Sequence, residues 1–186
     1  MEGAAAGIRW ETKDRTLVLT IDRQDRRNAL DPDAHHQLAS LFDSFADSDA
    51  HLVAIVTGAG DRAFCAGSDL KVRAGLDRAN LPSTGFAGLA ERFDLTKPVI
   101  AAVNGDAIGG GMEIVLACDL CVAVPSARFA LPEPRVGLVA SGGLHRLARQ
   151  LPLKQAMEVA LTGRMFSAAE AAETGVVNRI AAPADG

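Results

Sequence analysis

The sequence has no excess of positive charge and no long apolar run. Its 186 residues contain 19 Lys and Arg against 23 Asp and Glu, which gives a net charge of −4. Nucleic-acid-binding proteins usually carry a basic excess, so we expect no nucleic-acid partner. The longest apolar stretch runs from about Pro98 to Val103. It is far shorter than the roughly 18 residues that a membrane span needs, so no membrane span is expected.

Cysteine is also scarce. The chain has 3 cysteines, Cys65, Cys118 and Cys121, all in apolar surroundings. An odd number of buried thiols is typical of reduced cysteines in a cytosolic protein. The spacing Cys118-x-x-Cys121 lacks the second ligand pair of a structural zinc site, so no metal is expected. The first seven residues carry an acid and no basic segment, which is unlike a signal peptide. We expect a cytoplasmic protein.

The composition is that of one globular domain. Hydrophobic residues make up 48% of the chain and charged residues 23%, and these are ordinary globular values. We find no linker and no repeat. The sequence therefore predicts a single domain over residues 1–186, with residues 1–7 disordered.

Strands and helices alternate along the chain. The pattern predicts strands at about 8–11, 16–21, 52–58, 99–103, 120–124 and 176–180, and helices at about 32–47, 111–118, 143–150, 153–162 and 167–175. Several strands are continuously apolar, which is typical of a parallel sheet covered on both faces. The fold class is therefore α/β with a largely parallel sheet. Residues 75–91 are weakly patterned and are expected to form a surface loop with one irregular helix.

Two glycine-bearing loops each follow a buried strand. The first is Ala63 to Lys71, and the second is Asn104 to Glu113. Ligands bind at the carboxyl ends of the strands in an open α/β sheet. Glycines let the backbone approach a ligand and leave N–H groups free at a helix start. Two such loops can aim two N–H groups at one oxygen, as in an oxyanion hole, or they can be tight turns only.

Two glutamates are placed where they could share a site. Glu113 lies in the first turn of the helix that the glycines open, and Glu133 lies between Pro132 and Pro134. Two carboxylates facing one cavity can hold a water and divide acid and base work. The alternative is that Glu113 only complements the helix N-terminus and Glu133 is solvated. His145 could be a base, but a helical surface histidine is the favoured interpretation.

Other nucleotide and hydrolase motifs are missing. The chain contains no Gly-x-Ser-x-Gly elbow and no P-loop. The Gly109-Gly110-Gly111 cluster does not form Gly-x-Gly-x-x-Gly, because Ile114 occupies the last position.

The segments 63–71 and 97–119 resemble the two signature segments of the crotonase (enoyl-CoA hydratase/isomerase) superfamily. Residues 27–30 and 167–175 also match family positions in order. The resemblance implies a spiral of ββα units that assembles as a trimer or hexamer. It also implies an acyl-CoA thioester substrate and no metal or redox cofactor, since coenzyme A is part of the substrate.

Carried onto this chain residue by residue, the resemblance implies backbone oxyanion donors at Ser68 and Gly110. It implies that Glu113 and Glu133 hold the water and catalyse its syn addition to the 2,3-double bond of a 2-enoyl-CoA. The expected activity is that of an enoyl-CoA hydratase, a hydro-lyase. An isomerase, a dehydratase, a thioesterase or a catalytically weak acyl-CoA-binding protein remain alternatives.

The resemblance further implies coenzyme A contacts. The residues expected to make them are Arg26, Ala66 and Lys71. A backbone N–H in the loop at Ser141 and Gly142 would help to position the water. This loop lacks a proline found in many hydratases and is one residue shorter. We also expect the family's C-terminal helical segment to be missing here, and the acyl chain length cannot be read from the sequence.

Overall fold

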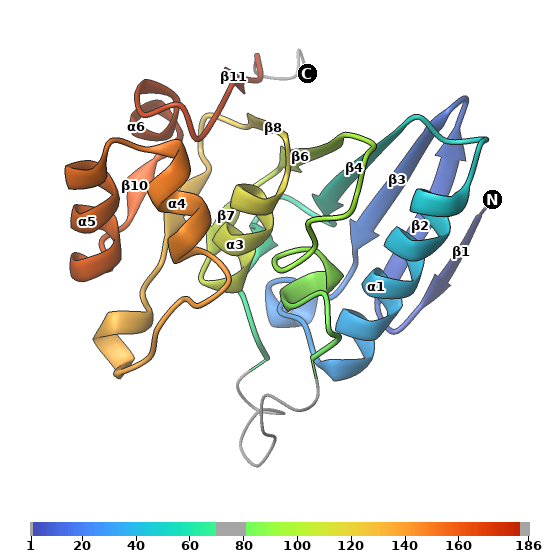
Figure 1. The fold of residues 1–186 in the computed structure, drawn as a ribbon, viewed down its shortest axis with the longest axis horizontal. Coiled ribbons are helices and arrows are strands. Elements are labelled where there is room, and N and C mark those ends of the chain that lie inside the picture. Colours follow the sequence, from blue (N-terminus) through green and yellow to red (C-terminus); the bar gives the residue numbers. More distant parts are fainter. Residues whose placement is uncertain (1, 70–80, 183–186) are drawn as a thin grey trace.

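The computed structural model describes residues 2–69 and 81–182 (Figure 1). The strands are β1 (Glu2–Ala5), β2 (Ile8–Lys13), β3 (Thr16–Ile21), β4 (Val53–Gly58), β5 (Ala63–Cys65), β6 (Val99–Val103), β7 (Asp106–Ile108), β8 (Leu120–Ala123), β9 (Arg128–Ala130), β10 (Phe166–Ser167) and β11 (Arg179–Ile180). The helices are α1 (Pro32–Asp47), α3 (Gly110–Ala117), α4 (Leu144–Gln150), α5 (Leu153–Thr162) and α6 (Ala168–Glu173), with 3-10 helices η1 (Gln24–Arg26), η3 (Phe86–Gly88) and η4 (Glu133–Val136).

The larger sheet has the strand order β1-β2-β3-β4-β6-β8-β11. Its first three strands are antiparallel, and from β3 onward every pairing is parallel. In the parallel part, inward residues of β3 and β4 are buried in strict alternation, as a pleated strand requires. The predicted α/β class with a largely parallel sheet is confirmed.

A second, smaller sheet has the order β10-β9-β7-β5. Its strands are two or three residues long, too short to show a periodic pattern, and the sequence did not predict them. They matter for function because β5 and β7 pair in parallel and so end at the same edge. The two glycine loops follow these two strands.

Helix α1 forms where the sequence signals place it. The Asp31 side chain accepts the N–H of Ala34 at 3.0 Å, and Pro32 occupies the first helical position. Such an N-cap satisfies one of the N–H groups that a helix start leaves without a partner. The face bearing Leu38, Leu41 and Phe42 is buried in the common core. Figure 1 shows α1 at the right of the view, α3 near the centre, and α4, α5 and α6 at the left.

The predicted disorder of residues 1–7 is wrong for the residues described. Glu2–Ala5 forms strand β1, which pairs antiparallel with β2. The side chain of Trp10 on β2 lies directly over Gly3, where an added Cβ would come within 2.4 Å of the indole ring. Glycine at position 3 thus lets the chain lie flat on the indole. The pairing with β1 also gives hydrogen-bond partners to the backbone groups at the edge of β2.

The prediction of a surface loop with one irregular helix at 75–91 is confirmed for the helix, which is η3 with a non-helical φ at Ala87, but the surface position is wrong for most of the described part. Residues 85–90 are buried and include η3, and residues 75–80 lie outside the described part. The cysteines are free and buried, as expected. In the described residues, no helix has the length and apolar character to cross a membrane.

Candidate active site

The two glycine loops meet through positions that have no side chain. A Cβ on Gly111 would lie 2.0 Å from the carbonyl oxygen of Cys65, and one on Gly67 would lie 3.2 Å from the backbone nitrogen of Gly110. Larger residues at these positions would push the loops apart. Glycine is therefore required here so that the turn after β5 can touch the start of α3.

Two backbone N–H groups face the junction. Leu30 donates its N–H to Gly67 O at 2.9 Å and accepts the N–H of Asp69 at 2.8 Å. This pairing leaves the N–H of Ser68 pointing away from Leu30, toward the β7 side of the sheet. Gly110 is the first residue of α3, so its N–H has no acceptor within the helix. Among the described residues no acceptor is found for either N–H.

The glutamate pair stands next to these donors. Glu113 lies in the first turn of α3, and Glu133 begins η4. Gly109 lies beside Glu133, since a Cβ on this glycine would be 3.0 Å from Glu133 Oε1. The chain between Glu113 and Glu133 forms α3, β8 and β9, and it returns Glu133 to the edge of the small sheet where α3 begins.

Glu113 is in an unusual electrostatic environment. Its side chain is 8% exposed, and Oε1 has no hydrogen-bond partner of good geometry among the described residues. Burial raises the pKa of Glu113, the carboxylate of Glu133 raises it further, and the N–H groups of Gly143 and Gly142 partly oppose the rise. A buried carboxylate beside a second one holds a proton more strongly than a solvated one.

The loop before α4 closes the site over Glu113. A Cβ on Gly142 would lie 3.2 Å from Glu113 Oε1, so Gly142 lies against the carboxylate. Ser141 is exposed, and its N–H donates to Val139 O at 2.9 Å. The N–H of Ser141 is thus already used, whereas the N–H of Gly142 acts on the carboxylate of Glu113.

Two of the residues expected to contact coenzyme A, Arg26 and Ala66, lie near each other at the first glycine loop. Ala66 donates its N–H to Arg27 O at 3.1 Å, which places it beside the turn that carries Arg26. Arg26 is exposed and forms an ion pair with Asp25 at 3.2 Å. Lys71 lies outside the described residues, so the structure does not place it.

The sequence analysis missed Asn28, which fixes that turn. Asn28 is 1% exposed and has a positive φ of 58°. Its side chain accepts the N–H of Arg23 at 3.0 Å and donates to Ala59 O at 3.0 Å and Ala63 O at 2.7 Å. Asparagine tolerates the left-handed region better than most residues. The asparagine after Arg27 was therefore the signal in the sequence that could have indicated this turn.

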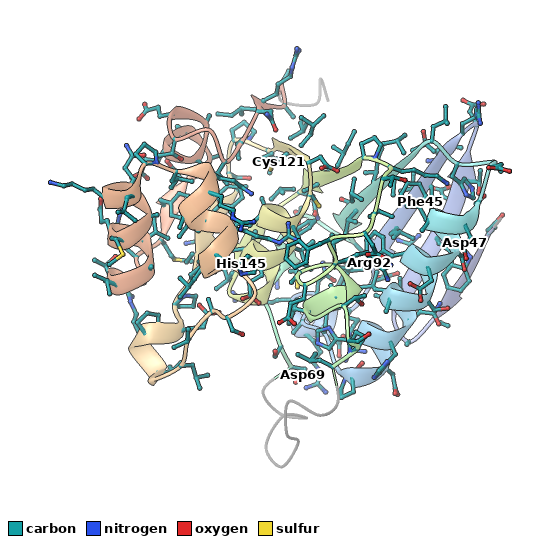
Figure 2. The ribbon with its side chains drawn as sticks, in the orientation of Figure 1. Phe45, Asp47, Asp69, Arg92, Cys121 and His145 are labelled. Atoms are coloured by element: carbon teal, nitrogen blue, oxygen red, sulfur yellow. The ribbon has the colours of Figure 1, made fainter. Side chains whose placement is uncertain are left out.

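Among the described residues, the ring contact of His145 is with Phe93 and not with the two glutamates. His145 lies on α4, half-buried, with its ring 5.8 Å from that of Phe93. Figure 2 shows His145 on α4 and Asp69 at the lower edge of the described chain. Asp69 is buried and lies 3.6 Å from the guanidinium of Arg23, so this ion pair helps to hold the turn at Arg23.

Comparison with known proteins places this site in a family. The sequence model of the family described as enoyl-CoA hydratase/isomerase matches residues 11–185. A carnitinyl-CoA dehydratase from Proteus mirabilis is 45% identical over 172 residues, which are 91% of this chain and 66% of that protein. A carnitinyl-CoA dehydratase from Salmonella enteritidis is 48% identical over 167 residues, 88% of this chain and 64% of that protein. The chain thus spans about two thirds of the length of these curated relatives.

Solved structures agree. The crystal structure of enoyl-CoA hydratase from Mycobacterium tuberculosis superposes with a TM-score of 0.90 at 42% identity, covering 97% of this chain and 71% of that one. The structure of a carnitinyl-CoA dehydratase from Mycobacterium avium gives 0.89 at 41% identity, covering 95% and 70%. The expected crotonase-like fold is confirmed. The chain belongs to the enoyl-CoA hydratase/isomerase family of the crotonase superfamily.

Proposed function

We propose that the chain catalyses the reversible addition of water to the 2,3-double bond of a 2-enoyl-CoA thioester, as a hydro-lyase. One observation carries this proposal. The carboxylate of Glu133 lies against Gly109, the residue before the N–H of Gly110, and it is close enough to Glu113 to raise the pKa of that buried carboxyl. An acid–base pair next to oxyanion donors is what hydration of a thioester-conjugated double bond requires.

In this proposal the backbone donors act on the thioester. As water adds at C3, negative charge develops on the thioester oxygen as an enolate. The N–H groups of Ser68 and Gly110 are fixed by the backbone and need no reorganisation when that charge appears. Donors of this kind lower the barrier by about 3–4 kcal/mol each in a site closed to water. The N-terminus of α3 adds a favourable dipole for the same charge.

The carboxylates divide the proton transfers. Ionised Glu113 removes a proton from the water as its oxygen bonds to C3. Glu133, in its protonated form, gives a proton to C2 as the enolate collapses. The hydroxyl added at C3 and the proton added at C2 reach the same face of the double bond, so the addition is syn. Burial supports the role of Glu113 because a raised pKa makes its carboxylate a stronger base.

The coenzyme A moiety is assigned to the outer side of the first loop. We place the adenine against the backbone near Arg26 and Ala66, with Lys71 close to the phosphates. This needs no redox cofactor, because coenzyme A enters and leaves as part of the substrate. We further propose a cytoplasmic trimer or hexamer, as the resemblance implies.

A second candidate is the same chemistry run in reverse on a 3-hydroxyacyl-CoA. The names of the curated relatives, carnitinyl-CoA dehydratase, favour it. Both candidates use the same residues, and they differ in the acyl group and direction. A thioesterase would instead release free coenzyme A thiol, and a binding protein would show affinity without turnover.

The test is loss of the conjugated thioester absorbance of crotonyl-CoA, measured for the wild type, Glu113→Gln and Glu133→Gln. Removing a general acid or base typically costs about 10²–10⁴-fold in rate, and we expect this loss in kcat for each variant. Glu173→Gln, on α6 and away from the pair, serves as the control and should keep full activity. Full hydration by Glu133→Gln, or release of free thiol by the wild type, would overturn the proposal.

A further inference from the structure

The segment of residues 85–92 lies between α1 and α3 in a conformation that needs support. Gly85, Ala87 and Gly88 all have positive φ, of 78°, 55° and 67°. Alanine is rarely found in this region. Gly88 lies so close to α1 that a Cβ would come within 2.4 Å of the Ala39 backbone. Such a backbone persists only where surrounding contacts determine it.

His35 on α1 supplies the contact at the strained residue. Its Nδ1 accepts the N–H of Ala87 at 3.0 Å, and its ring meets the ring of Phe86 edge-on with centroids 4.4 Å apart. A backbone N–H only donates, so Nδ1 must be unprotonated. The imidazole is 3% exposed, and burial lowers the pKa of His35 to about 4. The ring is therefore neutral near pH 7, as this hydrogen bond requires.

Phe86 carries the contact from His35 to the oxyanion donor. Its ring lies against Gly110, where an added Cβ would come within 2.3 Å of the ring carbon Cζ. Phe86 is 7% exposed and so forms a fixed wall beside the N–H of Gly110. The contacts run in sequence from α1, through the imidazole and Phe86, to the first residue of α3.

Two arginines hold the other end of the segment, and among the described residues their side chains form no hydrogen bond with Phe86. Arg92 donates to Gly88 O at 3.0 Å and pairs with Asp43 of α1. From α4, Arg146 donates to Ala90 O at 2.9 Å and to Arg92 O at 3.0 Å. Figure 2 labels Arg92 where the segment faces α1. These arginines hold the backbone at 88–92, whereas Phe86 is held by His35.

We propose that His35 is a positioning residue for the reaction: it holds Phe86 against Gly110 and so fixes the wall beside the oxyanion donor. His35 itself does not touch the reacting atoms. Its effect on turnover rests on the function proposed above, whereas its effect on the Gly110 amide does not.

The first test compares His35→Leu with His35→Asn on crotonyl-CoA. Leucine has no acceptor and leaves the Ala87 N–H without a partner. Asparagine carries its Oδ1 on the same Cγ as Nδ1, so it can accept the same N–H. We expect kcat to fall about tenfold in His35→Leu, as for a small misplacement near the reacting centre. We expect KM to change by less than about threefold and His35→Asn to recover most of kcat. His36→Leu, the exposed neighbour on α1, should match the wild type.

A merely structural role would give a different result. Both His35 variants would then lose stability, and the folded fraction of each would keep the wild-type kcat. Equal losses of kcat in His35→Leu and His35→Asn, or a loss confined to KM, would overturn the proposal. If His35→Leu does not fold, His35→Asn against His35→Gln gives the same comparison, because the glutamine oxygen sits one carbon further out.

A second test does not depend on turnover. The amide resonances of Ala87 and Gly110 are recorded by NMR in the wild type and the same variants. We expect both amides to shift in His35→Leu and to stay near their wild-type positions in His35→Asn. An unmoved Gly110 amide in His35→Leu overturns the proposal even if the wild type is active. An inactive wild type with the expected shifts overturns the proposed function and leaves the positioning role in place.

Discussion

The two halves of the site differ in how the chain holds them. The first half, the start of α3 with Gly110 and Glu113, is buried throughout its first two turns. The second half, Glu133 with η4 and residues 136–139, has exposed apolar side chains, including Val136 at 70% and Val139 at 68% exposure. Each half contributes one glutamate. The comparison shows that this chain's own packing determines the position of Glu113 more tightly than that of Glu133.

The largest expected effect comes from adding a methyl group to the packed half. Gly111→Ala places a Cβ 2.0 Å from Cys65 O, which forces the two loops apart. We expect a loss of about 3 kcal/mol or more in the free energy of unfolding and loss of hydratase activity in the folded fraction. Denaturant titration and the crotonyl-CoA assay measure the two effects.

The matched change in the second half is Gly137→Ala. No atom lies within 4 Å of the added Cβ, but the φ of 69° is unfavourable for alanine. We expect a cost of about 1 kcal/mol from the backbone alone. Equal losses at the two positions would contradict the contrast between the halves.

Asn28→Ala tests the turn that supports the first half. The change removes three hydrogen bonds from a site that is 1% exposed. It leaves the carbonyls of Ala59 and Ala63 and the N–H of Arg23 without these partners. We expect a loss of about 2–3 kcal/mol in unfolding free energy. Asn178→Ala, which removes the hydrogen bond that the Asn178 side chain accepts from Cys121 N–H, should cost less. The reverse order would show that the Asn28 turn does not stabilise this region more than the Asn178 contact does.

The raised pKa of Glu113 makes both activity and stability depend on pH. Because the folded protein binds this proton more strongly than the unfolded chain, ionised Glu113 costs stability above its unfolded pKa, about 4.5. Glu113→Gln should therefore raise the melting temperature at pH 8, and the gain should vanish as the pH falls toward 4.5. In the wild type, kcat should fall with decreasing pH at a pKa above the ordinary glutamate value. A variant no more stable than the wild type at pH 8 would contradict this environment.

The smallest effect is expected on the exposed apolar side. Leu161→Ser on α5 changes a side chain that is 68% exposed. Surface changes of this kind usually alter the unfolding free energy by less than about 0.5 kcal/mol. Leu38→Ser, at a buried position of α1, is the control and should cost several times more. A large loss in Leu161→Ser, measured by denaturant titration of this chain, would show that this face of α5, which lies beside η4, is more tightly packed than its exposure indicates.

The main elements could be predicted because their signals are local. The α1 helix has its cap at Asp31 and its apolar spacing within sixteen residues, and the parallel strands are continuously apolar. The start of α6 is marked equally locally, by a capping box in which the side chains of Ser167 and Glu170 each bond the other residue's backbone N–H. The strands of the small sheet were missed because two or three residues show no periodicity. Strand β1 was missed because its pairing depends on Trp10, not on its own residues.

The residues of the candidate site could be predicted from the sequence, but the contacts that hold them in place could not. Glycines after buried strands identified the loops that hold Ser68 and Gly110, and the structure brings these loops together. The contact of Phe86 with Gly110 and the bond from Ala87 to His35 span sequence separations of 24 and 52 residues, and nothing in the local sequence marks them. Lys71 lies outside the described residues, so its predicted role stays a prediction.

The measurement that tests the central claim most directly is NMR titration of the amides of Ser68 and Gly110 with butanoyl-CoA, a saturated thioester that cannot be hydrated. If these two N–H groups bind the thioester oxygen, both amide protons will shift downfield together as the ligand is added, and both will exchange more slowly with solvent. Binding of butanoyl-CoA that leaves both amides unchanged would contradict the account.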